Sequence, residues 1–72
     1  MDVTLSEKIR ILARRRNMTV AELAAKTGQS AQNLHNKLNR DNFTVKDLQV
    51  IATALNCDFE TAFTMRDTGE RI

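Results

Sequence analysis

Side-chain amides are concentrated in one short segment near the middle of the 72-residue chain. In residues 31–39, AQNLHNKLN, Gln32, Asn33 and Asn36 accompany only two large apolar residues, both leucines. At about 100° per residue, a helix here directs the three amides to one side and the leucines to the other. Gln and Asn amides can pair bidentately with N6 and N7 of adenine in the major groove of DNA, and each good pair contributes roughly 1–3 kcal/mol of discrimination. The three amides are therefore candidates for reading bases.

An ordinary solvated surface also exposes amides, so this pattern alone does not establish DNA binding. The formal net charge is +2 and the pI is about 9.1. A balance of this size permits a nucleic-acid partner without requiring one. The interpretation depends on the elements that hold residues 31–39 in place.

Several kinds of chemistry have no support in the sequence. The single Cys57 excludes an internal disulfide, and with the single His35 it cannot supply the three or four protein ligands of a zinc site. The chain offers no nucleophile–base pair, paired carboxylates or phosphate-cradling loop, and a core of this size leaves little room for a deep pocket. We therefore predict no enzyme activity, no cofactor, no metal and no small-molecule effector. No apolar run or leader suggests a membrane or export, so we expect a cytoplasmic protein.

Four polar residues mark the starts of four predicted helices. The chain has no Pro and only two Gly, which favours a mostly helical fold. The candidate N-caps are Thr4, Thr19, Ser30 and Thr44, and the first two begin capping boxes with Glu7 and Glu22. The helices predicted from these starts cover residues 5–16, 20–27, 31–39 and 45–55.

The middle two predicted helices have the spacing of a helix-turn-helix. Ala24 is small where the helices would cross, Gly28 suits a left-handed C-cap in the turn, and Leu34 would anchor the next helix to the core. The intervals of four and then six residues fit close packing across a short turn. The fourth helix is expected to face inward with Val45, Leu48, Ile51, Ala52 and Leu55.

The stretch MTVAELAAKTGQSAQNLHNKL, residues 18–38, followed by the apolar frame VKDLQVIATALNCDF, resembles the Cro/lambda-repressor-like helix-turn-helix proteins, the XRE family. The resemblance covers about residues 4–60. It implies a compact bundle of four or five helices and sequence-specific DNA binding, often by a dimer. This chain has Val20 where many members have a phosphate-contacting Gln, and Leu38-Asn39-Arg40 in place of a common Glu-Asn-Gly. The family's phosphate contacts therefore do not transfer directly.

The candidate contacts to the DNA backbone are cations and helix starts. Lys37 and Arg40 lie in or next to the reading segment and are the better phosphate candidates. Arg14, at the end of the first predicted helix, either complements the helix dipole or contacts phosphate. The main role expected for Thr19 and Ser30 is to cap their helices. The starts of these helices could also contact the DNA backbone, as the resemblance implies.

The end of the chain changes its periodicity. In FETAFTM, residues 59–65, alternate positions hold Phe59, Thr61, Phe63 and Met65, which predicts a β-strand followed by a turn at 67–70. The rival interpretation is a fifth helix capped by Asp58. An isolated strand is not stable, so it must pack on the bundle, fold back, or pair with its copy in a second chain.

A possible dimer surface comes from apolar residues that the core does not require. Ile11 points away from the apolar face of the first predicted helix, and with Phe59, Phe63 and Met65 it is a candidate dimer contact. A twofold pairing would place two reading helices about 34–36 Å apart, one turn of DNA.

The sequence thus predicts a mainly α fold, a four- to five-helix bundle of the lambda-repressor-like type with a C-terminal β-strand. Residues 1–58 form the helix-turn-helix domain and residues 59–72 an extension for dimerisation. The expected function is a transcriptional regulator that binds double-stranded DNA as a homodimer, with the helix at 31–39 in the major groove. The alternative is a protein-interaction or antitoxin-like module on the same fold, with weak or no DNA binding. The operator, the sign of regulation and the oligomeric state stay open.

Overall fold

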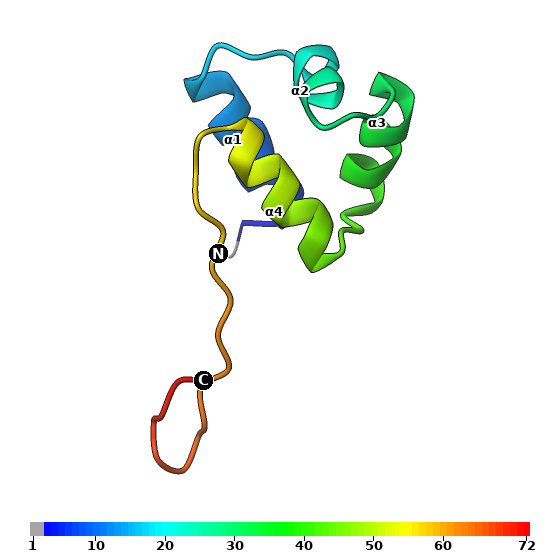
Figure 1. The fold of residues 1–72 in the computed structure, drawn as a ribbon. Helices are drawn as coiled ribbons and strands as arrows, with labels where there is room; N and C mark the ends of the chain where they lie inside the picture. The colour runs from blue at the N-terminus through cyan, green and yellow to red at the C-terminus, as the bar shows by residue number, and fades with distance from the viewer. Residues whose placement is uncertain (1–2) are drawn as a thin grey trace.

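The computed structural model describes residues 3–72, and this part of the chain contains four helices (Figure 1). They are α1 (Leu5–Arg15), α2 (Val20–Lys26), α3 (Ala31–Arg40) and α4 (Val45–Ala54). Each lies within one residue of its predicted bounds, and the mainly helical fold is confirmed. No helix among the described residues has the length and apolar character needed to span a bilayer.

Every helix begins at the side chain predicted to cap it. The cap oxygens accept hydrogen bonds at 3.0–3.1 Å from the backbone N–H three residues later, in Thr4, Thr19, Ser30 and Thr44. Thr19 and Thr44 form complete capping boxes, because Glu22 and Asp47 return a bond to the cap backbone. At Thr4 only half of the expected box forms, since Glu7 does not return the bond. These local bonds explain why the helix starts are readable from sequence.

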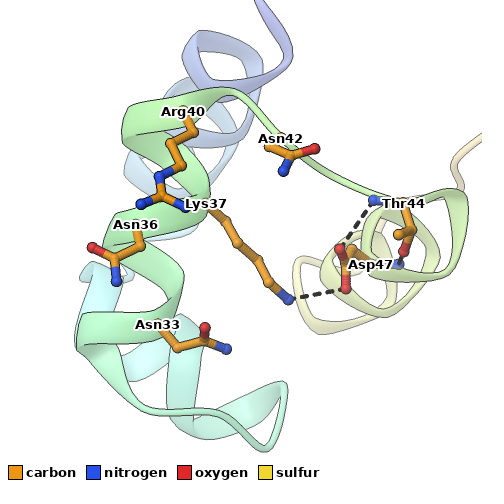
Figure 2. A pocket seen from close by; sticks show the side chains of 7 residues that line it. All are labelled: Asn33, Asn36, Lys37, Arg40, Asn42, Thr44 and Asp47. Atoms are coloured by element: carbon orange, nitrogen blue, oxygen red, sulfur yellow. Dashed lines mark hydrogen bonds and ion pairs between the residues drawn. The ribbon is translucent and has the colours of Figure 1, made fainter.

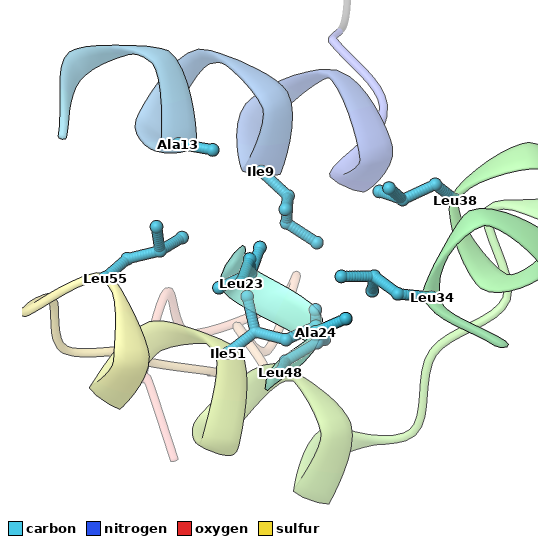
Figure 3. Packing of buried hydrophobic residues seen from close by; sticks show 9 residues of the cluster. All are labelled: Ile9, Ala13, Leu23, Ala24, Leu34, Leu38, Leu48, Ile51 and Leu55. Atoms are coloured by element: carbon cyan, nitrogen blue, oxygen red, sulfur yellow. The ribbon is translucent and has the colours of Figure 1, made fainter. Parts of the chain in front are cut away.

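The core lies where all four helices meet, and its largest fully buried side chains are Leu23, Leu34 and Leu55. Figure 3 shows side chains of α1 facing those of α4, with two leucines of α3 closing one end. The expectation that Val45 faces inward is wrong, because its side chain is 51% exposed. Val45 is the first residue of α4, one turn before the helix reaches the core at Leu48.

Two polar contacts join helix ends that are far apart in the sequence. Ser6 is the only buried polar residue among those described, and its single hydroxyl proton is shared between Leu38 O at 2.6 Å and Asp41 Oδ1 at 2.9 Å. Arg16 donates from Nε to Leu55 O at 2.9 Å and so caps the end of α4. The end of α3 is thereby tied to the start of α1, and the end of α1 to the end of α4.

The C-terminal segment leaves the bundle instead of adding a fifth helix to it (Figure 1). Phe63 and Ile72 exchange backbone bonds of 2.9 and 3.1 Å, and Met65 N donates to Glu70 O at 2.8 Å. The predicted turn forms, with Gly69 at φ +76°, but the only strand-like pairing in residues 3–72 is one isolated antiparallel bridge. Residues 59–65 form neither a helix nor a named strand in the structure, so the predicted strand and the rival fifth helix both stay unconfirmed.

Candidate nucleic-acid interface

The two sides of α3 have opposite roles. Leu34 is 0% exposed and Leu38 is 3% exposed, so the helix is anchored along its whole length in the core. Gln32, Asn33 and Asn36 are all exposed on the other side. The structure therefore brings the three predicted base-reading amides together on one free face.

Beside this face, α3 and the start of α4 enclose an open hollow of about 300 Å³ (Figure 2). It is lined by Asn33, Asn36, Lys37, Arg40, Asn42, Thr44 and Asp47. Four of the predicted site residues thus lie around one hollow. The last three were missed as site residues, although Asn42 stands in a polar connection next to the reading helix, which was the available signal.

An ion pair occupies one wall of the hollow. Lys37 Nζ lies 3.1 Å from Asp47 Oδ1, and the two side chains are 28% and 26% exposed. The bond from the Thr44 backbone N–H, followed by the bond from Lys37, holds the pKa of Asp47 below its ordinary value. A phosphate that approaches Lys37 must therefore compete with a carboxylate.

The helix starts differ in how they would receive an anion. α1, α2 and α4 each carry an acid in the first turn, whereas α3 carries none. At the start of α2, bonds from the backbone and side chain of Thr19 lower the pKa of Glu22, which keeps a negative charge beside the free N–H groups. The start of α3 at Ser30 has no such charge, so it is the better place for a phosphate.

The predicted cations separate into two groups. Arg40 is exposed at the end of α3 and lines the hollow, whereas Arg14 is exposed on α1 and does not. Lys46 was missed: it is exposed in the first turn of α4 and lines a neighbouring hollow with Asn33 and Lys37. A cation in the first turn is unfavourable for the helix dipole. The position of Lys46 in the sequence therefore already indicated that its charge serves something other than the stability of α4.

The amides of this face are also bonded to each other and to the turn before α3. Gln32 Nε2 donates to Asn36 Oδ1 at 3.1 Å, and Asn33 Nδ2 donates to Gln29 Oε1 at 2.9 Å. Gln29 is half-buried and was not a predicted site residue. Within residues 3–72, no three His, Cys, Asp or Glu side chains are grouped as a metal site would need.

A family model for the Cro/C1-type HTH DNA-binding domain matches residues 8–67, which is most of the chain. The chain belongs to this family. No curated protein and no solved structure matches it. Membership of this family supports a DNA-binding regulator in general. The family is one of DNA-binding domains and not of enzymes. In this Cro/C1-type domain, α2 and α3 form the helix-turn-helix, joined through a turn in which Gly28 has φ +74°.

The Cro/C1-type domain does not bring the predicted dimer contacts together. Phe59 is half-buried and packs against the core, beside a largely apolar groove between α1 and α4. Phe63 and Met65, by contrast, lie on the hairpin and are 85% and 41% exposed. Ile11, 40% exposed, lies on α1. A surface that unites Ile11 with the hairpin would therefore need a second chain.

Proposed function

We propose that this Cro/C1-type domain is a sequence-specific transcriptional regulator that places α3 in the major groove of DNA. One observation carries the proposal: α3 is anchored in the core by Leu34 and Leu38 while Gln32, Asn33 and Asn36 on its other side are exposed. In this proposal Gln32, Asn33 and Asn36 read base edges, where their donor and acceptor pairs match adenine. The protein would act where its DNA lies, which we take to be the cytoplasm.

Phosphate contacts would surround the reading face. Arg40 and the start of α3 at Ser30 are best placed, because neither has a carboxylate partner among the described residues. Lys37 would contribute after leaving Asp47. Thr19 and Arg14 would contact DNA phosphates at a greater distance from the amide face of α3. The charged carboxylate of Glu22 opposes any phosphate near Thr19.

We also propose that the protein is a homodimer joined through residues 59–72. From Glu60 onward every residue is exposed, and the hairpin presents Phe63 and Ile72 at 85% and 77% exposure. A two-stranded hairpin is marginal alone, whereas three or more strands with an apolar face are stable. Pairing with the hairpin of a second chain would cover these side chains, complete the predicted strand, and set two α3 helices one DNA turn apart.

Selection of binding sites from a pool of random DNA duplexes tests the proposal directly. We expect enrichment of one sequence, palindromic if the dimer binds, and affinity that falls steeply as salt rises. The double variant Gln32→Ala/Asn36→Ala should lose preference at the base positions that these two side chains read, retain the preference set by Asn33, and keep salt-dependent binding. Gln49→Ala, which truncates an exposed amide on α4, is the matched control and should change neither. Unchanged preference in the double variant would contradict the assignment of α3.

The exposed apolar hairpin favours a second candidate, a protein-interaction or antitoxin-like module on the same fold. The 85% exposure of Phe63 is the specific observation in its support. Such a module would show little affinity for any duplex even at low salt, whereas a regulator with several phosphate contacts would bind nonspecific DNA there.

A further inference from the structure

A continuous series of side-chain hydrogen bonds runs from the backbone of α2 to the reading face of α3. Thr27 Oγ1 donates to Ala24 O at 2.9 Å, and Gln29 Nε2 donates to Thr27 Oγ1 at 2.9 Å. Asn33 Nδ2 then donates to Gln29 Oε1 at 2.9 Å. Thr27 and Gln29 are half-buried, and only Asn33 is exposed. The series therefore begins on a helix of the bundle and ends at the surface that faces DNA.

The direction of this series follows from which groups can donate. The Ala24 carbonyl only accepts, so the single hydroxyl proton of Thr27 is used there. Thr27 Oγ1 must then accept, which turns the NH₂ of Gln29 toward it and the carbonyl of Gln29 toward Asn33. Asn33 must therefore donate, which leaves its Oδ1 and one N–H free. Reversing both amides would forfeit the bond between Thr27 and Ala24.

The other amide pair on α3 has no such anchor. Gln32 and Asn36 are both exposed, and their mutual bond of 3.1 Å is the only side-chain bond that either makes within residues 3–72. Turning both amides over restores the same bond in the opposite direction. Gln32 and Asn36 can therefore adapt to several bases, whereas Asn33 is held in one orientation.

We infer that Thr27 and Gln29 are positioning residues that make Asn33 select adenine over guanine. Adenine presents the N6 donor and the N7 acceptor, which match the free Oδ1 and N–H of Asn33. Guanine presents two acceptors, O6 and N7, so one of them would face Oδ1. An unanchored amide could turn its NH₂ toward guanine instead. This inference rests on the proposed function, because it assumes that α3 reads bases.

The test measures the ratio of affinities for adenine and guanine at each position of the best duplex from the random pool. Asn33→Ala identifies the position that Asn33 reads. Thr27→Val keeps the shape of the side chain and removes its hydroxyl, and Gln29→Met removes both bonds of the central amide. Thr27→Val and Gln29→Met should each lower the adenine-to-guanine ratio about three- to tenfold, which is the effect of one hydrogen bond. The loss should occur only at the position that Asn33 reads. Thr27→Ser retains the hydroxyl and should keep the wild-type ratio.

Several results would overturn the inference. They are an unchanged ratio in folded Thr27→Val and Gln29→Met, an equal loss at all positions, no position sensitive to Asn33→Ala, or a sensitive position that is not adenine. Thermal unfolding shows which variants fold, and Gln29→Met decides alone if Thr27→Val does not. Failure of the proposed function looks different, because the wild-type protein would then enrich no sequence from the pool.

Discussion

The carboxylate of Asp41 accepts two hydrogen bonds from Ser6, at 2.8 Å from the backbone N–H and at 2.9 Å from the hydroxyl. Asp41 follows the last turn of α3 in the left-handed conformation, with φ +51° and ψ +43°, and Ser6 lies in the first turn of α1. The left-handed backbone of Asp41 therefore ends α3, while its side chain satisfies a free N–H at the start of α1, 35 residues away. The contact sets where the end of α3 lies relative to the bundle.

Asp41→Gly should destabilise the domain by about 1–2 kcal/mol, since glycine tolerates the left-handed conformation but removes the acceptor for Ser6. In a domain of this size each 1 kcal/mol lowers the melting temperature by about 4–8 °C. Asp41→Asn keeps an acceptor oxygen and is the matched control, with a smaller loss. Equal melting temperatures for the glycine variant and the wild type would show that the contact does not stabilise the fold.

Acid should weaken the domain partly through Asp47. Because the Thr44 N–H and Lys37 lower the folded-state pKa of Asp47, the stability it contributes is fully present above the ordinary value of 3.8 and is lost as pH falls through the lower folded value. The stability that Glu22 contributes is likewise present above its ordinary pKa of 4.5 and is lost as pH falls through its lowered pKa in the folded state. Unfolding by urea at a series of pH values should show a smaller acid loss in Asp47→Asn than in the wild type. A curve for Asp47→Asn that parallels the wild type would contradict the role of Asp47.

Asp47→Asn should also strengthen DNA binding. It releases Lys37 from its ion pair and removes a negative charge from the hollow beside the reading face. We expect affinity for a nonspecific duplex at low salt to rise several-fold, since Lys37 no longer has to leave a carboxylate. Fluorescence anisotropy with a labelled duplex measures this. Asp58→Asn makes the same change of charge at an exposed residue away from this hollow and should have a smaller effect.

Removing one phosphate contact should lower the salt dependence by a definite amount. Arg40→Ala and Lys37→Ala should each reduce the slope of log K against log salt by about 0.9, the contribution of one neutralised phosphate on duplex DNA. Lys26→Ala removes the same charge from an exposed site on α2 that does not line the hollow, so its slope should stay at the wild-type value. If all three variants change the slope equally, net charge and not position controls binding.

The hairpin should control assembly and not folding. Phe63→Ser should weaken the homodimer tenfold or more in sedimentation equilibrium and leave the helical circular dichroism unchanged, because Phe63 is 85% exposed and lies outside the core cluster. Val45→Ser, which replaces another exposed apolar residue, is the control and should dimerise normally. A wild-type protein that stays monomeric at high concentration would remove the dimer from the proposal.

Local patterns were enough to predict the helices of this protein. Each N-cap bonds a backbone N–H only three residues away, as Thr19 does with Glu22, so the necessary residues stand together in the sequence. The division of α3 into a buried and an exposed side follows from the helical period in the same way. The family, too, was predicted from residues 18–38, and the match over residues 8–67 confirms it.

Contacts between distant residues were decided only by the tertiary structure. Nothing near Asp41 indicates that it bonds Ser6, and nothing near Arg16 indicates that it caps the end of α4, 39 residues away. Lys37 was predicted as a phosphate contact from its place beside α3, and only the packing of α4 against the bundle brings Asp47 within 3.1 Å of it. The exposure of Phe63 was also decided by the tertiary structure. An alternating apolar pattern predicts an extended segment, whereas its distance from the bundle depends on how the whole chain packs.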